Sequence, residues 1–177
     1  MKIVSIFGTE EGKLLAMQYA DNEPDALSIL DDQWNDPEYL REFFIQYEKD
    51  YRNYYGSGKI KDLVISTKAE ANELFDNLYD LAAADDLGSF FKPLHAKEAD
   101  ESFNLQQLKA YGYERQSFLR IYAVRFNETY VITGGAIKLT NTMQERPHTK
   151  AELIKLNKVC DYLGANPDQV EFVYLTK

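Results

Sequence analysis

Residues 119–140 read LRIYAVRFNETYVITGGAIKLT, and this stretch decides the fold. From Phe118 to Phe126, side chains alternate between two faces with the period of a β-strand, and Asn127-Glu128 supplies a turn. Two further strands are predicted at 130–133 and 136–140. The pair Gly134-Gly135 joins them and permits a bulge or a sharp bend. Consecutive hairpins of this kind predict an antiparallel sheet.

The N-terminal half combines one hairpin with several helices. Residues 3–7 and 13–20 are rich in β-forming side chains and flank a polar loop bracketed by glycine, which is typical of a hairpin. A short helix is predicted at 24–30. A second helix is predicted from the cap Asp36, with Pro37 at its first position, to Gly56. The run Thr67-Lys68-Ala69-Glu70 has the form of a capping box and predicts a third helix that continues to Asp86.

The remaining segments complete the predicted order of elements. We expect a strand at 90–94, an exposed loop at 96–102 and a short helix at 105–110. A second capping box, Thr149 to Glu152, predicts a helix that stops at Gly164, and a last strand is expected at 170–175. An antiparallel sheet with helices grouped mainly in the first half indicates the α+β class. We expect a single domain over 1–177, with an acidic hairpin-plus-helices part at 1–88 and a sheet with a C-terminal helix at 89–177.

Bulk composition excludes several classes of protein. The apolar content of 45% excludes general disorder, and no apolar run reaches the length of a membrane span. The apolar run at the start of the chain is too short for a signal peptide, so we expect a cytoplasmic protein without membrane contact. One cysteine and two histidines make a zinc site of the usual kinds improbable, and we expect no cofactor and no metal.

Charge is distributed unevenly along the chain. Residues 103–163 hold nine Lys/Arg against five Asp/Glu, whereas the remainder holds eleven against twenty-four. The net charge of −9 is therefore +4 in that segment and −13 elsewhere. A local cationic surface attracts phosphate or an acidic partner, whereas the acidic remainder discourages indiscriminate coating of nucleic acid. A solvated helix face with scattered lysines explains the same counts equally well.

Side chains of the types that bind and cleave RNA occur in this segment. Metal-free cleavage needs a group that removes the 2′-hydroxyl proton, cations that stabilise charge on phosphorus, and an acid for the leaving oxygen. The candidate catalytic residues are Lys138, His148 and Tyr122, and the candidate substrate-binding residues are Arg120, Arg146 and Thr140. Arg120, Tyr122, Lys138, Arg146 and His148 are candidates for one anion-binding site, to which backbone N–H groups at the helix start would add. Alternatively, His148 decorates a surface loop and Lys138 stands on a solvated strand face.

Three segments carry a resemblance to a known family: 119–122, 132–140 and 149–162. They are similar to the C-terminal core of RelE/HigB-type toxins, small messenger-RNA interferases that are usually neutralised by a cognate antitoxin. Gly135, Lys138 and Thr140 fit the strand pattern of the HigB-like branch, whereas Leu139 replaces the second lysine of a pair. The resemblance covers roughly residues 89–163. It implies a RelE-like core, metal-free messenger-RNA cleavage, RNA or the ribosome as partner, and an antitoxin.

The function expected first from the sequence is a toxin-like RNA endonuclease of a toxin–antitoxin system, and two other functions compete with it. Leu139 and the acidic balance of the chain favour a non-catalytic binding module that keeps the RelE-like scaffold but has lost nuclease activity. The helices rich in Tyr and Phe also suit a structural partner in a complex. We expect no DNA contact in any of these cases.

Overall fold

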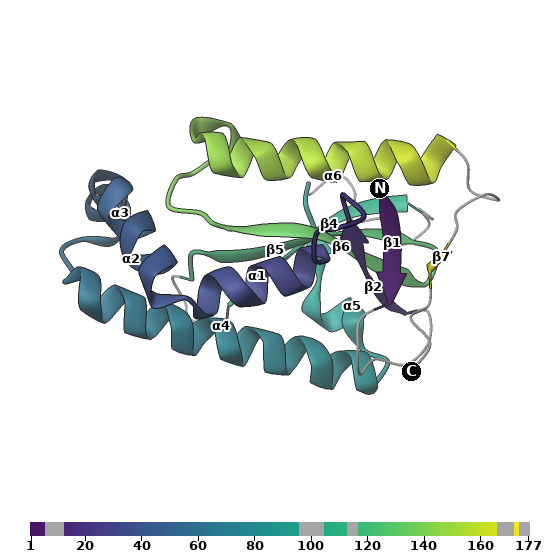
Figure 1. Cartoon of the computed structure of the whole chain (residues 1–177), viewed down its shortest axis with the longest axis horizontal. Helices are drawn as coiled ribbons and strands as arrows, with labels where there is room; N and C mark the ends of the chain where they lie inside the picture. The colour runs from purple at the N-terminus through teal and green to yellow at the C-terminus, as the bar shows by residue number, and fades with distance from the viewer. Residues whose placement is uncertain (6–12, 96–104, 113–116, 166–171, 174–177) are drawn as a thin grey trace.

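The computed structural model describes residues 1–5, 13–95, 105–112, 117–165 and 172–173, and its architecture is α+β. A sheet forms the middle layer (Figure 1). One face is covered by α6 (Pro147–Ala165), which packs on the central strands. On the other side α1 (Ala26–Asn35) packs on the sheet, and α4 (Ile60–Ala83) packs on α1. The α+β class predicted from the sequence is therefore confirmed.

The sheet contains strands from both ends of the chain. Its order is β3-β4-β5-β6-β2-β1-β7. The strands are β1 (Lys2–Ser5), β2 (Leu14–Gln18), β3 (Lys92–Pro93), β4 (Leu105–Tyr111), β5 (Leu119–Phe126), β6 (Thr129–Ile137) and β7 (Phe172–Val173). The hairpins β1-β2, β4-β5 and β5-β6 are antiparallel, as expected, but β2 pairs with β6 and β1 with β7 in parallel. The sheet is mixed because a long helical connection follows the N-terminal hairpin, and β6 then pairs in parallel with β2 at the edge of that hairpin.

The remaining helices lie between β2 and β4 or precede α6. They are α2 (Pro37–Gln46), α3 (Glu48–Tyr55), α5 (Leu87–Phe90) and the 3-10 helix η2 (Met143–Glu145). The predicted cap is confirmed, because the Asp36 carboxylate accepts a hydrogen bond from the Glu38 N–H and Pro37 is the first helical residue. The single helix predicted from Asp36 to Gly56 is instead two helices, since α2 ends at Gln46 and Tyr47 separates it from α3.

A helix predicted at 105–110 is wrong, because this segment forms β4. Burial alternates along β4: Gln106, Leu108 and Ala110 are buried and their neighbours are half-buried or exposed. The run LQQLKA has no β-branched residue, and its local preference is helical. Hydrogen bonding to β5 along the whole strand overrides that preference.

Both helices predicted from the Thr-Lys-Ala-Glu runs are present, as α4 and α6, but neither run caps its helix. Thr67 and Glu70 are buried inside α4, which starts seven residues before Thr67. Thr149 lies within the first turn of α6, where its hydroxyl donates to the carbonyl oxygens of Met143 and Arg146. A capping box does form nearby, between Thr142 and Glu145 of η2.

Residues 129–137 form one strand, not two. The glycine pair lies inside β6, and the register against β5 shifts between Tyr122 and Ala123. Gly134 has φ of +151°, and a Cβ atom there would collide with the Glu152 carboxylate of α6. The glycine pair therefore serves close packing of α6 and α1 on the sheet. The loop predicted at 96–102 lies outside the described residues, as do parts of the first hairpin loop and of the last strand.

Candidate functional site

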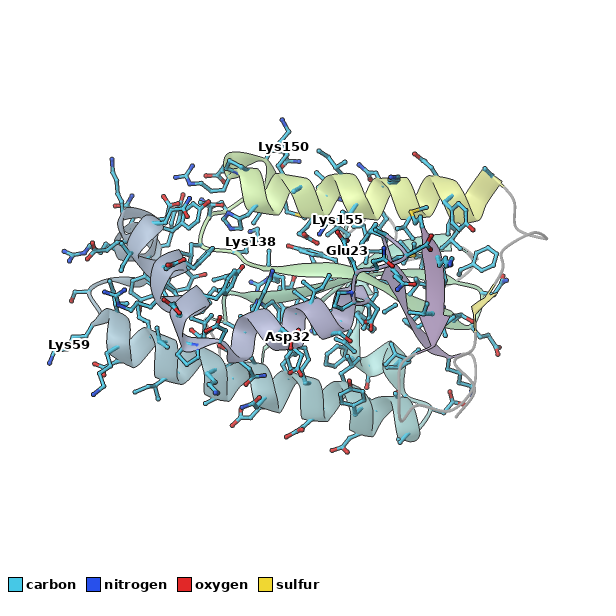
Figure 2. The ribbon with its side chains drawn as sticks, in the orientation of Figure 1. Glu23, Asp32, Lys59, Lys138, Lys150 and Lys155 are labelled. Carbon is cyan, nitrogen blue, oxygen red and sulfur yellow. The ribbon has the colours of Figure 1, made fainter. Side chains whose placement is uncertain are left out.

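A cavity of about 400 Å³ lies between the sheet and the N-terminal half of α6. Its polar lining comes mainly from Lys109, Tyr111, Arg120, Tyr122, Lys138 and the exposed imidazole of His95. This set of six residues is called the cationic pocket below. Figure 2 shows Lys138 beneath the start of α6. The volume falls in the range typical of small-molecule and cofactor sites.

Strand register brings four of these side chains together. Arg120 and Tyr122 are two positions apart on β5 and share a face, as the sequence predicted. Tyr111 lies directly opposite Arg120 on β4, and Lys109 lies opposite Tyr122. Directly opposed residues of antiparallel strands project to the same face of the sheet. Lys109 and Tyr111 of β4 therefore join Arg120 and Tyr122 of β5 on the face that lines the cavity.

Arg120 is held in place by its neighbours. Its Nη1 donates to the carbonyl oxygens of Ser117 and Leu119, at 2.8 and 2.6 Å, and its guanidinium carbon lies 4.2 Å from the centre of the Tyr111 ring. Burial lowers the pKa of Arg120 from its ordinary value. A guanidinium carries five N–H donors, so Arg120 keeps donors for a ligand after these contacts.

Both lysines are anchored by backbone carbonyls. Lys138 Nζ donates to the carbonyl oxygens of Thr140 and Asn141, each at 2.7 Å, and Lys109 Nζ donates to that of Leu94 at 3.0 Å. Burial, followed by the charge of Arg120, lowers the pKa of Lys138 from its ordinary value. Each ammonium retains at least one further N–H for a ligand.

No carboxylate lines the cationic pocket in the part of the chain that the structure describes. Glu145 lies close enough to favour the charged form of Lys138, but its carboxylate accepts hydrogen bonds from the Thr142 N–H and hydroxyl. Three cations therefore converge without a compensating acid in the cavity wall. Like charges gathered at partly buried positions are a common signature of a binding site for an anion.

Tyr122 is buried, with 1% of its surface exposed, and its hydroxyl has no hydrogen-bond partner. Burial raises the pKa of the Tyr122 phenol from its ordinary value. The phenol is therefore neutral at physiological pH and is a hydrogen-bond donor that a ligand in the pocket can satisfy. As the first catalytic base it is poorly suited, because it retains its proton.

Arg146 and His148 do not join the cationic pocket, so the expected convergence of the candidate residues is only partial. Arg146 forms a bidentate ion pair with the Asp50 carboxylate, with both N···O distances at 2.5 Å. His148 Nε2 lies 2.9 Å from the carbonyl oxygen of Ile137, and its ring packs against Phe43 and lines a different cavity. Thr140 is buried, and its hydroxyl donates to the Thr142 carbonyl oxygen.

Sequence reasoning missed Lys109, Tyr111 and His95. Lys109 fell within the segment that was predicted to be helical. If residues 105–111 had been read as a strand paired with the predicted strand at 118–126, Lys109 and Tyr111 would have shared a face. His95 gave no signal, because its position at the pocket depends on how β3 pairs with β4.

The Asp50–Arg146 ion pair predicts a specific dependence of stability on pH. The hydrogen bonds from Arg146 hold the pKa of Asp50 below its ordinary value of 3.8, so the stability from this pair is fully present above pH 3.8. It is lost as the pH falls through the lowered pKa of the folded protein. We expect Asp50→Asn to lower the melting temperature at pH 7, and the difference from the wild type to shrink on acidification. The exposed Asp32→Asn is the control, and an equal shift in both variants would contradict a role of the pair.

No protein-family model, curated protein or solved structure matches the chain. The class of protein is therefore set by the fold and the site: an α+β protein with a cationic pocket between its sheet and its C-terminal helix. Among the described residues, none of the helices combines the length and the apolar character that crossing a membrane requires.

Proposed function

We propose that the cationic pocket binds the phosphate backbone of RNA and that the protein is a non-catalytic RNA-binding module. The observation that carries the proposal is the convergence of Lys109, Arg120 and Lys138 on one cavity whose described wall contains no carboxylate. Phosphate oxygens accept charge-assisted hydrogen bonds from such cations.

Two tyrosines make the pocket suitable for a nucleotide rather than for phosphate alone. Tyr111 lines the cavity and is 38% exposed, so it presents an aromatic surface on which an unstacked base can pack. The unpartnered Tyr122 hydroxyl can donate to a phosphate or ribose oxygen. The acidic remainder of the chain confines binding to this face.

The test is binding of a fluorescein-labelled single-stranded RNA 12-mer, measured by anisotropy at two salt concentrations. We expect Lys109→Met and Lys138→Met each to weaken binding roughly tenfold, because a hydrogen bond to a charged group contributes about 1.5 kcal/mol or more. Each variant should also reduce the steepness of the salt dependence, because one fewer counterion is released. Raising the pH should weaken wild-type binding earlier than an ordinary lysine predicts, since the pKa of Lys138 is lowered.

Lys150→Met is the matched control. Lys150 is exposed on the side of α6 that points away from the sheet (Figure 2). Its removal changes the net charge by the same amount as the pocket variants. An equal loss of affinity in Lys150→Met would reject the pocket and leave only a diffuse charge effect.

The exposed His95 in the wall of the cationic pocket supports a second candidate function, a metal-free messenger-RNA interferase. In this candidate, the His95 imidazole takes the proton-transfer role first assigned to His148, and Lys138 stabilises charge on phosphorus. A cognate antitoxin would then mask the pocket. RNA cleavage in EDTA that Lys138→Ala and His95→Ala abolish, and that His148→Ala leaves intact, would establish this function over the non-catalytic one.

A further inference from the structure

A second cavity, of about 260 Å³, lies on the other flank of α6. It is enclosed by α1, α2, α6 and the end of β6 from Gly134 to Ile137, and it is called the α1–α6 cavity below. The cavity exists because β2 pairs with β6 only as far as Ile132, so that the rest of β6 meets helices instead of a strand. It is separate from the cationic pocket, and the two cavities share no lining residue.

Two buried acceptor atoms in the wall of this cavity, Glu152 Oε2 and His148 Nδ1, have no hydrogen-bond partner of ordinary geometry, and they lie one helical turn apart on α6. The Gly135 backbone N–H lies close enough to the Glu152 carboxylate to lower its pKa, and it leaves further lone pairs on the carboxylate for a ligand. Because the Ile137 carbonyl can only accept, His148 carries its proton on Nε2 and its Nδ1 is left as an acceptor. Glu152 is only 8% exposed. Buried polar atoms are nearly always satisfied in folded proteins, so two orphaned acceptors in one cavity point to a missing donor.

The cavity already accommodates one ammonium group. Lys155 Nζ donates to Glu152 Oε1 at 2.7 Å and lies 5.4 Å from the centre of the Tyr19 ring. Tyr39, Trp34 and Phe43 add further aromatic wall. A carboxylate beside aromatic faces is a favourable environment for an organic cation.

The acceptors require a ligand that donates hydrogen bonds, which excludes an anion. Burial raises the pKa of Glu152 despite the opposing effects of Lys155 and of the Gly135 backbone N–H, and burial lowers the pKa of His148. The cavity does not offer the ligands that a metal ion needs, because no group of three or more His, Cys, Asp or Glu side chains forms among the residues that the structure describes. The apolar side chains of Ala26 and Leu30 leave room for the body of an organic molecule.

We propose that the α1–α6 cavity binds a small organic cation that carries a primary ammonium or amidinium group on an apolar or aromatic body. The cationic group bonds to Glu152 Oε2 and His148 Nδ1, and the body packs against Trp34 and Phe43. Lys155 occupies part of the site and competes with the ligand for Glu152.

The experiment measures binding of benzylamine and benzamidine by NMR titration of the whole protein, with benzyl alcohol as the neutral comparison. We expect both cations to bind and benzyl alcohol to bind at least about tenfold more weakly, because it lacks the charge that Glu152 requires. Equal affinity for benzylamine and benzyl alcohol would overturn the proposal. Titration with zinc ions that saturates the same resonances more tightly than either cation would also overturn it.

Two variants test the assigned groups. Glu152→Gln should weaken binding of benzamidine at least tenfold, or roughly the effect of removing one charge-assisted hydrogen bond. Lys155→Met should strengthen binding severalfold because it removes the competing ammonium, an effect that a merely structural role of Lys155 would not produce. Unchanged affinity in both variants rejects the site. Glu42→Gln, at an exposed position on α2, is the control for charge.

The two cavities can be tested independently. Lys138→Met should leave benzamidine binding unchanged, and Glu152→Gln should leave RNA binding unchanged. If Lys138→Met weakened benzamidine binding as strongly as Glu152→Gln does, the assignment of the cation to the α1–α6 cavity would fall, whatever the outcome for RNA.

Discussion

Replacing Trp34 by alanine is expected to lower the free energy of unfolding by about 3–5 kcal/mol, the largest effect of any single substitution considered for this protein. Trp34 is 1% exposed at the end of α1, and its ring stacks on Phe75 of α4 with centroids 5.7 Å apart. Trp34 therefore connects α1, which packs on the sheet, to α4, which packs on α1. Removing the indole leaves a cavity that rigid helices on both sides cannot close.

The measurement is urea denaturation followed by circular dichroism, because the variant lacks the tryptophan that fluorescence would report. Tyr79→Ala is the matched control, since Tyr79 is on α4 as Phe75 is, but 39% of its surface is exposed. We expect the control to cost less than about 1 kcal/mol. Losses of similar size in Trp34→Ala and Tyr79→Ala would contradict the special contribution of the buried Trp34–Phe75 contact.

Replacing Gly135 by alanine is expected to cost roughly 2–3 kcal/mol. A Cβ atom at this position would lie 2.6 Å from the carbonyl oxygen of Arg120 and 2.8 Å from Leu30 Cδ1. The first contact is with the backbone of the neighbouring strand, which cannot rotate away as a side chain can. The strand β5 must shift, and with it the side chains of Arg120 and Tyr122, so RNA binding should fall together with stability.

Gly88→Ala serves as the control for this substitution. An added Cβ atom at Gly88 would meet only the Tyr130 hydroxyl, at an ordinary contact distance of 3.5 Å. Its effect on the midpoint of urea denaturation should therefore be small. If Gly135→Ala were as stable as Gly88→Ala, the close approach of β5, β6 and α1 would not be a constraint on this fold.

Local sequence signals predicted those elements that are specified by residues close together in the chain. The period of a β-strand at 118–126 and the helix start Asp36-Pro37 were both visible in the sequence, and the elements were predicted near their observed positions, β5 at Leu119–Phe126 and α2 from Pro37. The start of α4 was missed because no side-chain cap marks it: Lys59 occupies the cap position without a side-chain hydrogen bond. Capping boxes were over-interpreted because Thr and Glu at that spacing also occur inside buried helical turns.

In the candidate site, too, residues specified by local patterns were predicted, and contacts between distant segments were not. Arg120, Tyr122 and Lys138 were identified from strand alternation and charge, and they do line one cavity. Arg146 is adjacent to the same stretch in sequence, but Asp50 is 96 positions away, and that contact removes Arg146 from the site. A pairing at this distance along the chain leaves no trace in the local pattern.

By itself, the sequence determined the α+β class, the strand face that carries Arg120 and Tyr122, and the concentration of positive charge in residues 103–163. These properties follow from periodicity and composition, which act over a few residues. Only the tertiary structure decided that β4 is a strand, that β2 pairs in parallel with β6, and that α6 separates the cationic pocket from the α1–α6 cavity. Those outcomes depend on hydrogen bonding and packing between segments far apart in the chain, whose combined free energy exceeds the small preferences of individual residues.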